Sequence, residues 1–423
     1  MTIEFDPCHH PDVSDPYPFY RQLRDEAPIH RSTSTGALCI ARYEDVAAVL
    51  KDSDTFSSSA MRTFLMNGGR SERPPLSLPA LRFFFGLILR ARVNPYRMQN
   101  GRNLISEDGP PHAEMRNIVN RGFTPSQVAR LEVQARELVA VSMQILDAGG
   151  PFDLVRDLAI PLPVSLICEI LGIEVGKRED FKRWSDAIVD VSTGPGRDAP
   201  FEARVFKTFL ELVTYFSRIA RQRAKHPGDD LISTIVHGNA GEESLSTLDV
   251  VNFVTLLMVA GNETTTNLIG NATLALLQHP EARKAVEDDL SLVPEAIEEA
   301  LRYDAPIQLL FREATCDTEI NGTRIAKGEI VVPLLGSANR DERQFDDPDV
   351  FRLGRSRSGH LGFGFGAHFC LGASLARLEA RAALEGLVPR LSALEIEGPV
   401  PRIHSFLIRG PRQLKLRRMA SAA

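Results

Sequence analysis

Apolar residues recur every three or four positions along most of the chain, which is the spacing expected of amphipathic helices. The pattern is clearest at 125–146 and 245–278. Short β-like runs are found at 37–43, 318–325 and 329–335, with a turn predicted at Asn321-Gly322, and a further small hairpin is predicted at 402–417. The chain is therefore predicted to be mainly α with small β-sheets. Loops rich in proline and glycine occur without a shift of composition, which favours a single domain over residues 1–423.

The longest helical pattern is predicted to begin at Ser246, where Asp249 three residues later completes a cap, and to end at Gln278 before a proline. At 1.5 Å per residue it spans roughly 45 to 50 Å. A polar block, AGNETT at 260–265, interrupts its apolar character. Thr264 can bond the carbonyl of Ala260 four residues earlier, which predicts a kink there.

Composition is ordinary for a globular protein, with 43% hydrophobic and 25% charged residues. The net charge of −6 argues against general binding of nucleic acid. The longest uncharged apolar run, Phe83 to Leu89, has seven residues and is too short for a transmembrane anchor. Five scattered cysteines and an N-terminus without a signal-like segment predict a cytoplasmic location.

Cys370 lies in the stretch FGFGAHFCLG at 363–372, with no other cysteine nearer than Cys316. A structural zinc site needs several nitrogen or sulfur ligands at short spacing, so a lone cysteine does not fit one. A helix is predicted from Ala373, which would place the sulfur at a helix N-terminus and favour the thiolate. An iron held in a flat macrocycle by one thiolate fits this arrangement. The alternative is a buried free cysteine in a glycine-rich turn.

These residues, followed by LAR, resemble the haem-binding segment of the cytochrome P450 superfamily. The resemblance implies the fold of that family, a long helix crossing a haem that a cysteine loop holds. It also implies haem b, iron protoporphyrin IX, with Cys370 as axial ligand of the metal. Further haem contacts are then expected from Ala260, Phe363, Gly364, His368 and Gly372.

The AGNETT block resembles the oxygen-activation motif of the same family, with Glu263 as the acid and Thr264 as the alcohol. Splitting the O–O bond of O2 requires two protons, delivered inside a pocket that excludes water. A carboxylate can relay protons from solvent and a hydroxyl can pass them on. Taken alone, Glu263 could instead be a solvated helix residue, and Thr264 a threonine bonded to its own helix.

Glu299 and Arg302 lie three apart on a predicted helix, where they can pair. Alone, such a pair is common on exposed helices. In the family this ExxR pair is buried and meets an arginine, for which Arg355 aligns. The haem propionates need cationic or hydrogen-bonding partners. Four residues are predicted for that role, although each alone could be a surface cation: His112, Arg116, Arg312 and His368.

The resemblance also places the substrate contacts. The predicted lining is apolar, with Gln308 and His404 as polar anchors. It comprises Leu256, Leu257, Val259, Ile307, Gln308, Leu309, Leu310, Phe406 and Leu407. The apolar run at 80–89 could roof the pocket, touch a membrane surface or be a packed helix.

The predicted function is that of a monooxygenase that hydroxylates or epoxidises a hydrophobic small molecule: a terpenoid, steroid, fatty acyl compound or polyketide. The chain is too short for a fused flavin reductase, so ferredoxin and ferredoxin reductase are the expected electron donors of a monomer. A basic excess at 350–382 is the predicted ferredoxin surface, and a scatter of structural arginines is the alternative. Two rival functions are a peroxide-driven peroxygenase and a non-catalytic haem-binding sensor.

Overall fold

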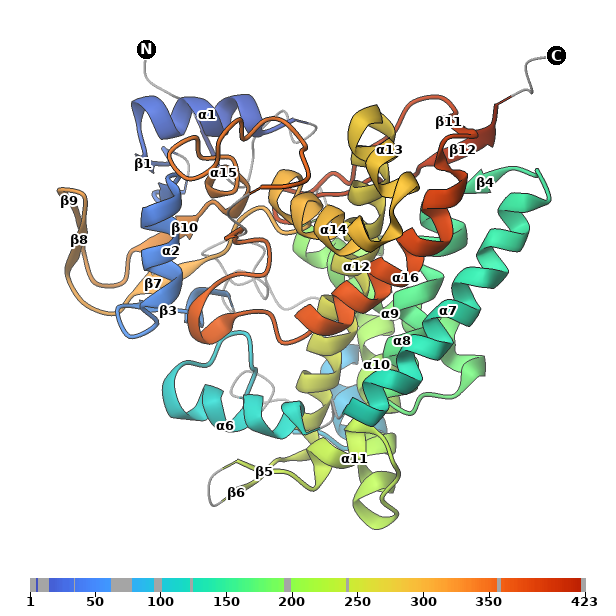
Figure 1. Cartoon of the computed structure of the whole chain (residues 1–423). Coiled ribbons are helices and arrows are strands. Elements are labelled where there is room, and N and C mark those ends of the chain that lie inside the picture. Colours follow the sequence, from blue (N-terminus) through green and yellow to red (C-terminus); the bar gives the residue numbers. More distant parts are fainter. Residues whose placement is uncertain are drawn as a thin grey trace. The chain divides into compact units, whose positions relative to one another are not determined.

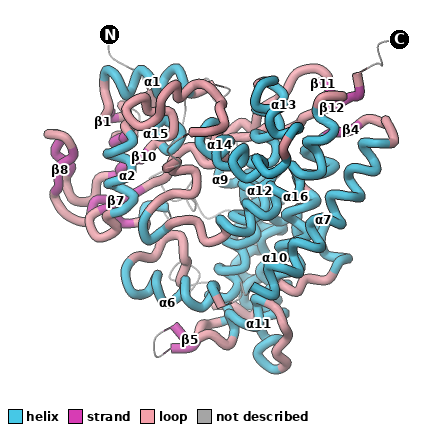
Figure 2. Tube along the Cα trace, viewed as in Figure 1, coloured by secondary structure: helices cyan, strands magenta, loops and turns pink. Residues whose placement is uncertain are grey.

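The structure is a computed structural model that describes residues 5–6, 15–33, 35–61, 78–94, 101–121, 125–193, 199–240, 243–355 and 359–419. The chain divides into two compact units that alternate along the sequence. The first unit comprises Met1–Phe56, Val128–Pro163 and Glu263–Ala423. The second comprises Ser57–Gln127 and Val164–Asn262. Helices make up most of the trace and strands are short, as predicted (Figure 2).

The first unit holds about half of the helices of the described chain (Figure 1). The predicted helix at 125–146 is confirmed as α7. The helices of this unit are α1 (Tyr17–Glu26), α2 (Tyr43–Lys51), α7 (Pro125–Asp147), α13 (Pro280–Asp288), α14 (Val293–Tyr303), α15 (Leu335–Ala338) and α16 (Ala373–Leu391). Short helical turns add η2 (Val155–Ala159), η4 (Leu290–Leu292) and η5 (Gly366–His368).

The largest sheet of the first unit has the strand order β1-β2-β10-β7-β3. Its strands are β1 (Ile29–Arg31), β2 (Leu38–Ile40), β3 (Phe56–Ser57), β7 (Arg312–Ala314) and β10 (Ile330–Pro333). Strands β2 and β10 are parallel, with Val332 opposite Cys39. A three-stranded sheet joins β4 (Phe152–Asp153), β12 (Lys415–Arg418) and β11 (Leu394–Ile396).

The predicted turn at Asn321-Gly322 is confirmed, because it joins β8 (Thr318–Ile320) to β9 (Thr323–Ile325). Both turn residues have positive φ, 45° and 78°, which an Asn-Gly pair adopts readily. The hairpin predicted at 402–417 is confirmed only in part. Arg402 bridges Pro411, but the last strand, β12, pairs with β11 and β4 instead.

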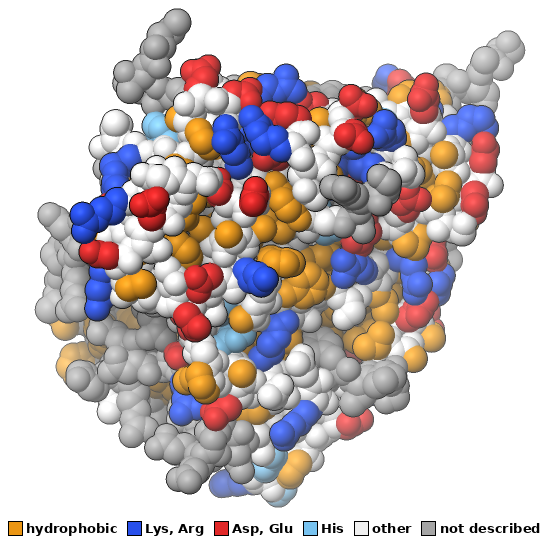
Figure 3. Space-filling view, turned by 60° about the vertical axis from the view of Figure 1, so that its left-hand side comes forward, with side chains coloured by type: hydrophobic (Ala, Val, Ile, Leu, Met, Phe, Trp, Pro, Cys, Tyr) orange, Lys and Arg blue, Asp and Glu red, His pale blue; other side chains and the backbone are white. Residues whose placement is uncertain are grey.

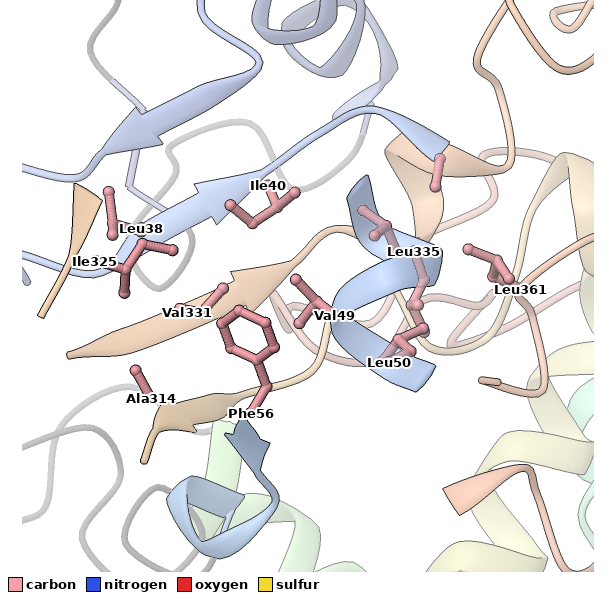
Figure 4. Packing of buried hydrophobic residues seen from close by; sticks show 12 residues of the cluster. Leu38, Ile40, Val49, Leu50, Phe56, Ala314, Ile325, Val331, Leu335 and Leu361 are labelled. Carbon is pink, nitrogen blue, oxygen red and sulfur yellow. The ribbon is translucent and has the colours of Figure 1, made fainter. Parts of the chain in front are cut away.

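A hydrophobic cluster joins the large sheet to α2. Val46, Val49 and Leu50 follow helical spacing, so they share the face of α2 that packs against the sheet. Figure 4 shows Val49, Phe56 and Val331 of β10 close together, with Leu50 farther along α2. Other members are Leu38, Ile40, Ala314, Ile325, Leu335, Ala338 and Leu361. Leu361 precedes the predicted haem-binding segment by two residues, so this cluster anchors one end of it.

The second unit is built from helices and one two-stranded hairpin. Its helices are α4 (Leu78–Gly86), α6 (Gly109–Asn120), α8 (Pro161–Ile170), α9 (Arg178–Thr193), α10 (Ala199–Lys225) and α11 (Leu231–Val236), with the turns η1 (Leu87–Ala91) and η3 (Val175–Lys177). Strands β5 (Asn239–Ala240) and β6 (Glu243–Ser244) form the hairpin. Within this unit α10 packs against α4, η1, α9 and α11.

The long helix is α12 (Thr247–Gln278), and its predicted cap is confirmed. The Ser246 amide and hydroxyl both donate to Asp249 Oδ2, at 2.9 and 2.7 Å, and the Asp249 amide donates back to Ser246 Oγ at 3.2 Å. The helix then continues without a break through 260–265. The polar block therefore lies within one continuous helix, and the kink at Thr264 stays a prediction.

Candidate active site

The segment around Cys370 forms a narrow loop closed by its own backbone. The Cys370 amide donates to the Phe363 carbonyl and the Gly364 amide donates to Leu361, both at 2.8 Å, and Phe369 donates to Gly366 at 3.1 Å. Gly364 and Gly366 have φ of 71° and 73°, which strongly favours glycine at both positions. The loop thereby fixes the backbone of Cys370, which is half-buried.

The loop is docked against α2 at Gly366. A Cβ there would lie 2.7 Å from the Leu50 carbonyl oxygen and 3.0 Å from the Lys51 Cα. No side chain fits at that distance, so glycine is required for packing as well as for its φ. Gly372 differs, because nothing lies within 4 Å of a Cβ built on it. The backbone beside Gly372 is therefore open, as a site for a flat ring requires.

Helix α16 begins three residues after Cys370, as predicted. Gly372 is its N-cap residue, the Ala373 amide donates to the Cys370 carbonyl at 3.4 Å, and Ala376 donates to Gly372 at 2.9 Å. The helix N-terminus is therefore next to the cysteine, and its positive end favours a thiolate there. Arg377 follows one turn later, and its guanidinium lies 4.6 Å from the centroid of the Phe363 ring.

A carboxylate on α14, Glu298, joins the two ends of this segment. It accepts from Arg377 Nε at 2.6 Å and Nη2 at 2.9 Å, and pairs with His360 Nε2 at 3.0 Å. Burial would raise the pKa of Glu298, but the bonds from Arg377 and His360 outweigh it and lower that pKa to about 2. Glu298 is thus ionised at neutral pH and ties the loop to α14.

The structure brings Glu299, Arg302 and Arg355 together next to Glu298 on α14. Arg302 is 3% exposed and makes two bonds of 2.8 Å to the Glu299 carboxylate, while Arg355 Nε donates to the same carboxylate at 2.9 Å. The two guanidiniums also bind backbone carbonyls of Asn339, Asp346, Asp347, Pro348 and Val350. The alternative of an exposed surface pair is excluded.

The residues in the polar block of α12 differ in how deeply they are buried. Asn262 donates to Ser185 Oγ at 3.3 Å, and Thr266 donates to the Ala159 carbonyl at 2.9 Å. Because these side chains find partners outside their own helix, they do not compete for its carbonyls, which accounts for the unbroken helix. Glu263 and Thr264 are only half-buried.

A buried acid that sequence reasoning overlooked is Glu379 on α16. It is 1% exposed and bonds Thr265, the residue after Thr264, while its Oε2 has no hydrogen-bond partner among the described residues. Burial raises the pKa of Glu379 well above its ordinary value, and the Thr265 bond offsets only part of this. The sequence alone gave Glu379 no predicted role in the site. Its sole warning was an acid at a position where α16 is otherwise apolar.

The predicted propionate partners fall into both units. In the first, Arg312 of β7 is 3% exposed and donates to the Phe311 carbonyl at 2.9 Å, and His368 of η5 is half-buried. In the second, α6 carries His112, which is 4% exposed, and Arg116, which is half-buried one turn later. The predicted helical spacing of that second pair is confirmed.

The predicted substrate contacts differ in exposure. Leu256, Leu257 and Val259 are half-buried on α12, and Ala260 is exposed. Ile307, Leu310 and Phe406 are also half-buried, whereas Leu309 and Leu407 are buried. Gln308 is 2% exposed and donates to the Ala305 carbonyl at 2.8 Å, while its backbone bonds Leu407 and Gly336. Its Oε1 has no hydrogen-bond partner among the described residues, and the role of Gln308 as a substrate anchor stays a prediction.

The basic excess predicted at 350–382 is offset by acids from elsewhere in the chain. Arg377 pairs with Glu298, Arg381 with Glu132 at 2.7 Å, and Arg352 with Asp347 at 3.4 Å. Arg357 lies outside the described residues. Cationic and anionic side chains are interspersed on the face seen in Figure 3. The excess was a count along the sequence, and folding places acids beside the arginines.

The thiolate loop, the buried Glu-x-x-Arg pair and the acid-alcohol pair on a long helix define a class of protein, and comparison with known proteins gives the same class. The chain belongs to the cytochrome P450 family, whose model, described as Cytochrome P450, matches residues 83–416. Among solved structures it is similar to cytochrome P450 CYP109Q5 from Chondromyces apiculatus, with a TM-score of 0.84, 36% identity and coverage of 100% of both chains.

Two further relatives carry a named activity or ligand. Erythromycin C-12 hydroxylase from Saccharopolyspora erythraea is 35% identical over 88% of this chain and 86% of its own length. The structure of CYP109E1 from Bacillus megaterium, a complex with corticosterone, is 32% identical, covers 96% of this chain and 98% of its own, and has a TM-score of 0.79. The chain is therefore a cytochrome P450 monooxygenase, of a family that uses haem with a cysteine thiolate, redox partners and hydrophobic substrates.

Across the described ranges, every helix is too short or too polar to cross a membrane.

We expect Glu379→Gln to change how stability depends on pH. A carboxyl whose pKa is raised in the folded state binds its proton more tightly there, so its contribution to stability is complete below the unfolded pKa of about 4.3 and is lost as pH rises. The loss is up to about 1.4 kcal/mol per pH unit until the folded pKa is reached. The Gln variant should therefore exceed the natural protein in melting temperature at pH 8, and by less at pH 5.

Thermal unfolding at the two pH values, followed by circular dichroism, measures this difference. Glu385→Gln is the matched control, because Glu385 is on the same helix but pairs with Arg136 in a partly exposed bridge. It should give no gain at pH 8. An equal difference between Glu379→Gln and the natural protein at both pH values would contradict a raised pKa of Glu379.

Proposed function

We propose that the protein hydroxylates or epoxidises a hydrophobic small molecule, with Cys370 as the axial thiolate ligand of haem b. The observation that carries the proposal is the closed loop that presents Cys370 immediately before α16, with Gly372 open beside it. When bound, the haem supplies the iron at which O2 is activated. Phe363, Gly364, His368 and Gly372 would contact it from this loop, and Ala260 from α12.

The proton-handling roles fall to Glu263 and Thr264. Both are half-buried, whereas their neighbours Asn262, Thr265 and Thr266 are buried. A carboxylate that keeps partial contact with solvent can carry protons inward, and an adjacent hydroxyl can hold and pass them. Propionate binding is proposed for His112, Arg116, Arg312 and His368, of which His112 and Arg312 are the most buried.

The substrate class proposed is a terpenoid, steroid, fatty acyl compound or polyketide. Two relatives support a large apolar substrate, one named for hydroxylating erythromycin and one solved with corticosterone. The half-buried apolar residues available for it are Leu256, Leu257, Val259, Ile307, Leu310 and Phe406. Leu309 and Leu407 lie deeper and would shape the site through their neighbours.

Ferredoxin and ferredoxin reductase are the proposed electron donors of a monomeric, cytoplasmic enzyme. Phe365 and Phe369, 43% and 39% exposed, flank the thiolate loop, and partly exposed Arg377 and Arg381 follow on α16. Exposed aromatics bordered by arginines are a common composition of protein interfaces. A peroxide-driven enzyme would not need Glu263 and Thr264, and a gas sensor gains little from a thiolate that promotes O–O cleavage.

The ligand assignment predicts a spectroscopic result. Cys370→Ala should load haem poorly and should lose the red-shifted Soret band of the reduced carbon monoxide complex, because that shift requires a thiolate. Cys316→Ala, at an exposed cysteine, is the control and should keep the band. A red-shifted band in the Cys370 variant would refute the assignment.

The proton assignment predicts a loss of coupling. Thr264→Ala should consume reductant at a comparable rate while releasing peroxide in place of product, since protons would reach the wrong oxygen. The matched control is Thr273→Ala, on the same helix, where the hydroxyl donates to the Ile269 carbonyl at 2.8 Å. Product formed per reductant consumed is the measurement, and tight coupling in the Thr264 variant would count against the relay.

The electron-donor proposal predicts turnover with a ferredoxin system and slow turnover with peroxide alone. Arg381→Glu should weaken ferredoxin binding at least severalfold, and less so at high salt, because exposed charges are screened. Arg324→Glu is the control, since Arg324 is 81% exposed on β9 and pairs locally with Asp317. If turnover with peroxide alone equals turnover with the ferredoxin system, the result would favour the peroxygenase. If neither the ferredoxin system nor peroxide gives turnover, the result would favour a sensor.

A further inference from the structure

The helix formed by α4 and η1 has two apolar faces, and one of them is packed. Phe83 is buried and stacks on Phe206 of α10, with ring centroids 5.2 Å apart and an interplanar angle of 30°. It also meets Phe209 edge-on at 6.3 Å. A Cβ on Gly86 would lie 2.4 Å from the side chain of Leu210, so the two helices are in close contact. This face holds the segment firmly on the second unit.

The other face carries five large apolar side chains in contact with solvent. They follow one another at intervals of three, one, three and one residues, and five of the fourteen exposed large hydrophobics in the described chain gather here. Their exposures are Leu81 42%, Phe84 37%, Phe85 64%, Ile88 52% and Leu89 76%. Isolated exposed apolar residues are normal on a soluble protein, but a contiguous group of this size marks an interaction surface.

The charged residues on this segment itself are all positive. Arg82, Arg90 and Arg92 are exposed on the same segment. From 73 to 106 the sequence has six arginines and no aspartate or glutamate, in a chain whose net charge is −6. The partner that this face fits is therefore both apolar and anionic.

The length and the charge of this segment decide which partner its exposed apolar face can bind. A symmetric contact between two copies would bring the arginines of both into one interface, which like-charge repulsion disfavours. Fourteen residues span roughly 21 Å, too short to cross a bilayer about 30 Å thick. A helix with an aromatic and aliphatic face bordered by arginines can instead lie in the plane of an anionic bilayer surface.

We propose that α4 and η1 form an in-plane anchor that binds the surface of a bilayer containing anionic phospholipids. Phe84, Phe85, Ile88 and Leu89 enter the boundary between headgroups and acyl chains. Arg82, Arg90 and Arg92 bind lipid phosphates at its edge. The packed face on α10 keeps the helix from turning its apolar side inward, so the exposed face stays available to lipid.

Flotation of the haem-loaded protein with lipid vesicles tests this proposal. The protein should float with phosphatidylcholine vesicles that contain phosphatidylglycerol and remain unbound with phosphatidylcholine alone. Phe85→Asp combined with Leu89→Asp should lower the partition coefficient at least about tenfold, because two charges would enter the apolar layer. Arg90→Gln and Arg92→Gln should each lower it about fivefold at low salt.

Val133→Asp combined with Val141→Asp is the matched control. These valines of α7 are 59% and 57% exposed, so the pair makes the same change of charge at another exposed helix face. It should leave flotation unchanged. An unaltered Soret band in the reduced carbon monoxide complex shows that each variant keeps its haem and fold, whatever its substrate.

Three results would overturn the proposal. The first is no flotation with phosphatidylglycerol vesicles, or flotation that the Phe85 and Leu89 changes leave intact. The second is concentration-dependent dimerisation without lipid that the same changes abolish, which would assign the face to a second copy. The third is loss of substrate-induced Soret shifts in that variant with vesicle binding unaffected, which would assign the helix to the substrate site.

Discussion

The buried carboxylate of Glu299 is the interaction on which the arrangement around the cysteine depends. Two arginines share it, and their remaining N–H groups bind carbonyls along the segment from Asn339 to Val350. Each buried charge is therefore paired and hydrogen-bonded, which is the condition for tolerating ions in a protein interior. Removing one member would leave an unpaired charge, at a cost of about 3–5 kcal/mol. Because Glu298 next to it binds His360 and Arg377, one turn of α14 holds both sides of the thiolate loop.

One set of contacts holds the loop in place, and a different set forms the surroundings of the cysteine. Side chains of α14 and the cluster around Leu361 fix where the loop lies. The backbone bond from Cys370 to Phe363 and the start of α16 then set the surroundings of the sulfur. Helix α16 continues to Glu379, whose bond to Thr265 reaches the helix that carries Glu263 and Thr264. Within the first unit, the predicted metal ligand and the predicted proton donors are thus connected through one buried hydrogen bond.

Features that depend on neighbours along the chain could be predicted from the sequence. The Ser246 cap, the Asn321-Gly322 turn and the start of α16 after Cys370 all follow from local hydrogen bonding and backbone preference. Features that depend on distant segments could not. Arg381 is neutralised by Glu132, which lies 249 residues away, and Glu379 is buried because α16 packs against α12 through Thr265. The sequence alone does not show which side chain pairs with a given charge. It also does not show whether that charged side chain is buried.

The same limit explains why one apolar run admitted three interpretations. In the run at 80–89, Phe83 and Phe85 are chemically identical, yet the first is 7% exposed and the second 64% exposed. Composition shows that the segment is apolar, whereas only packing on α10 decides which face is covered. A packed helix and a surface-binding helix are therefore compatible here, because one face serves each role. For an enzyme of hydrophobic substrates, a face that binds lipid would also place the protein where such molecules accumulate.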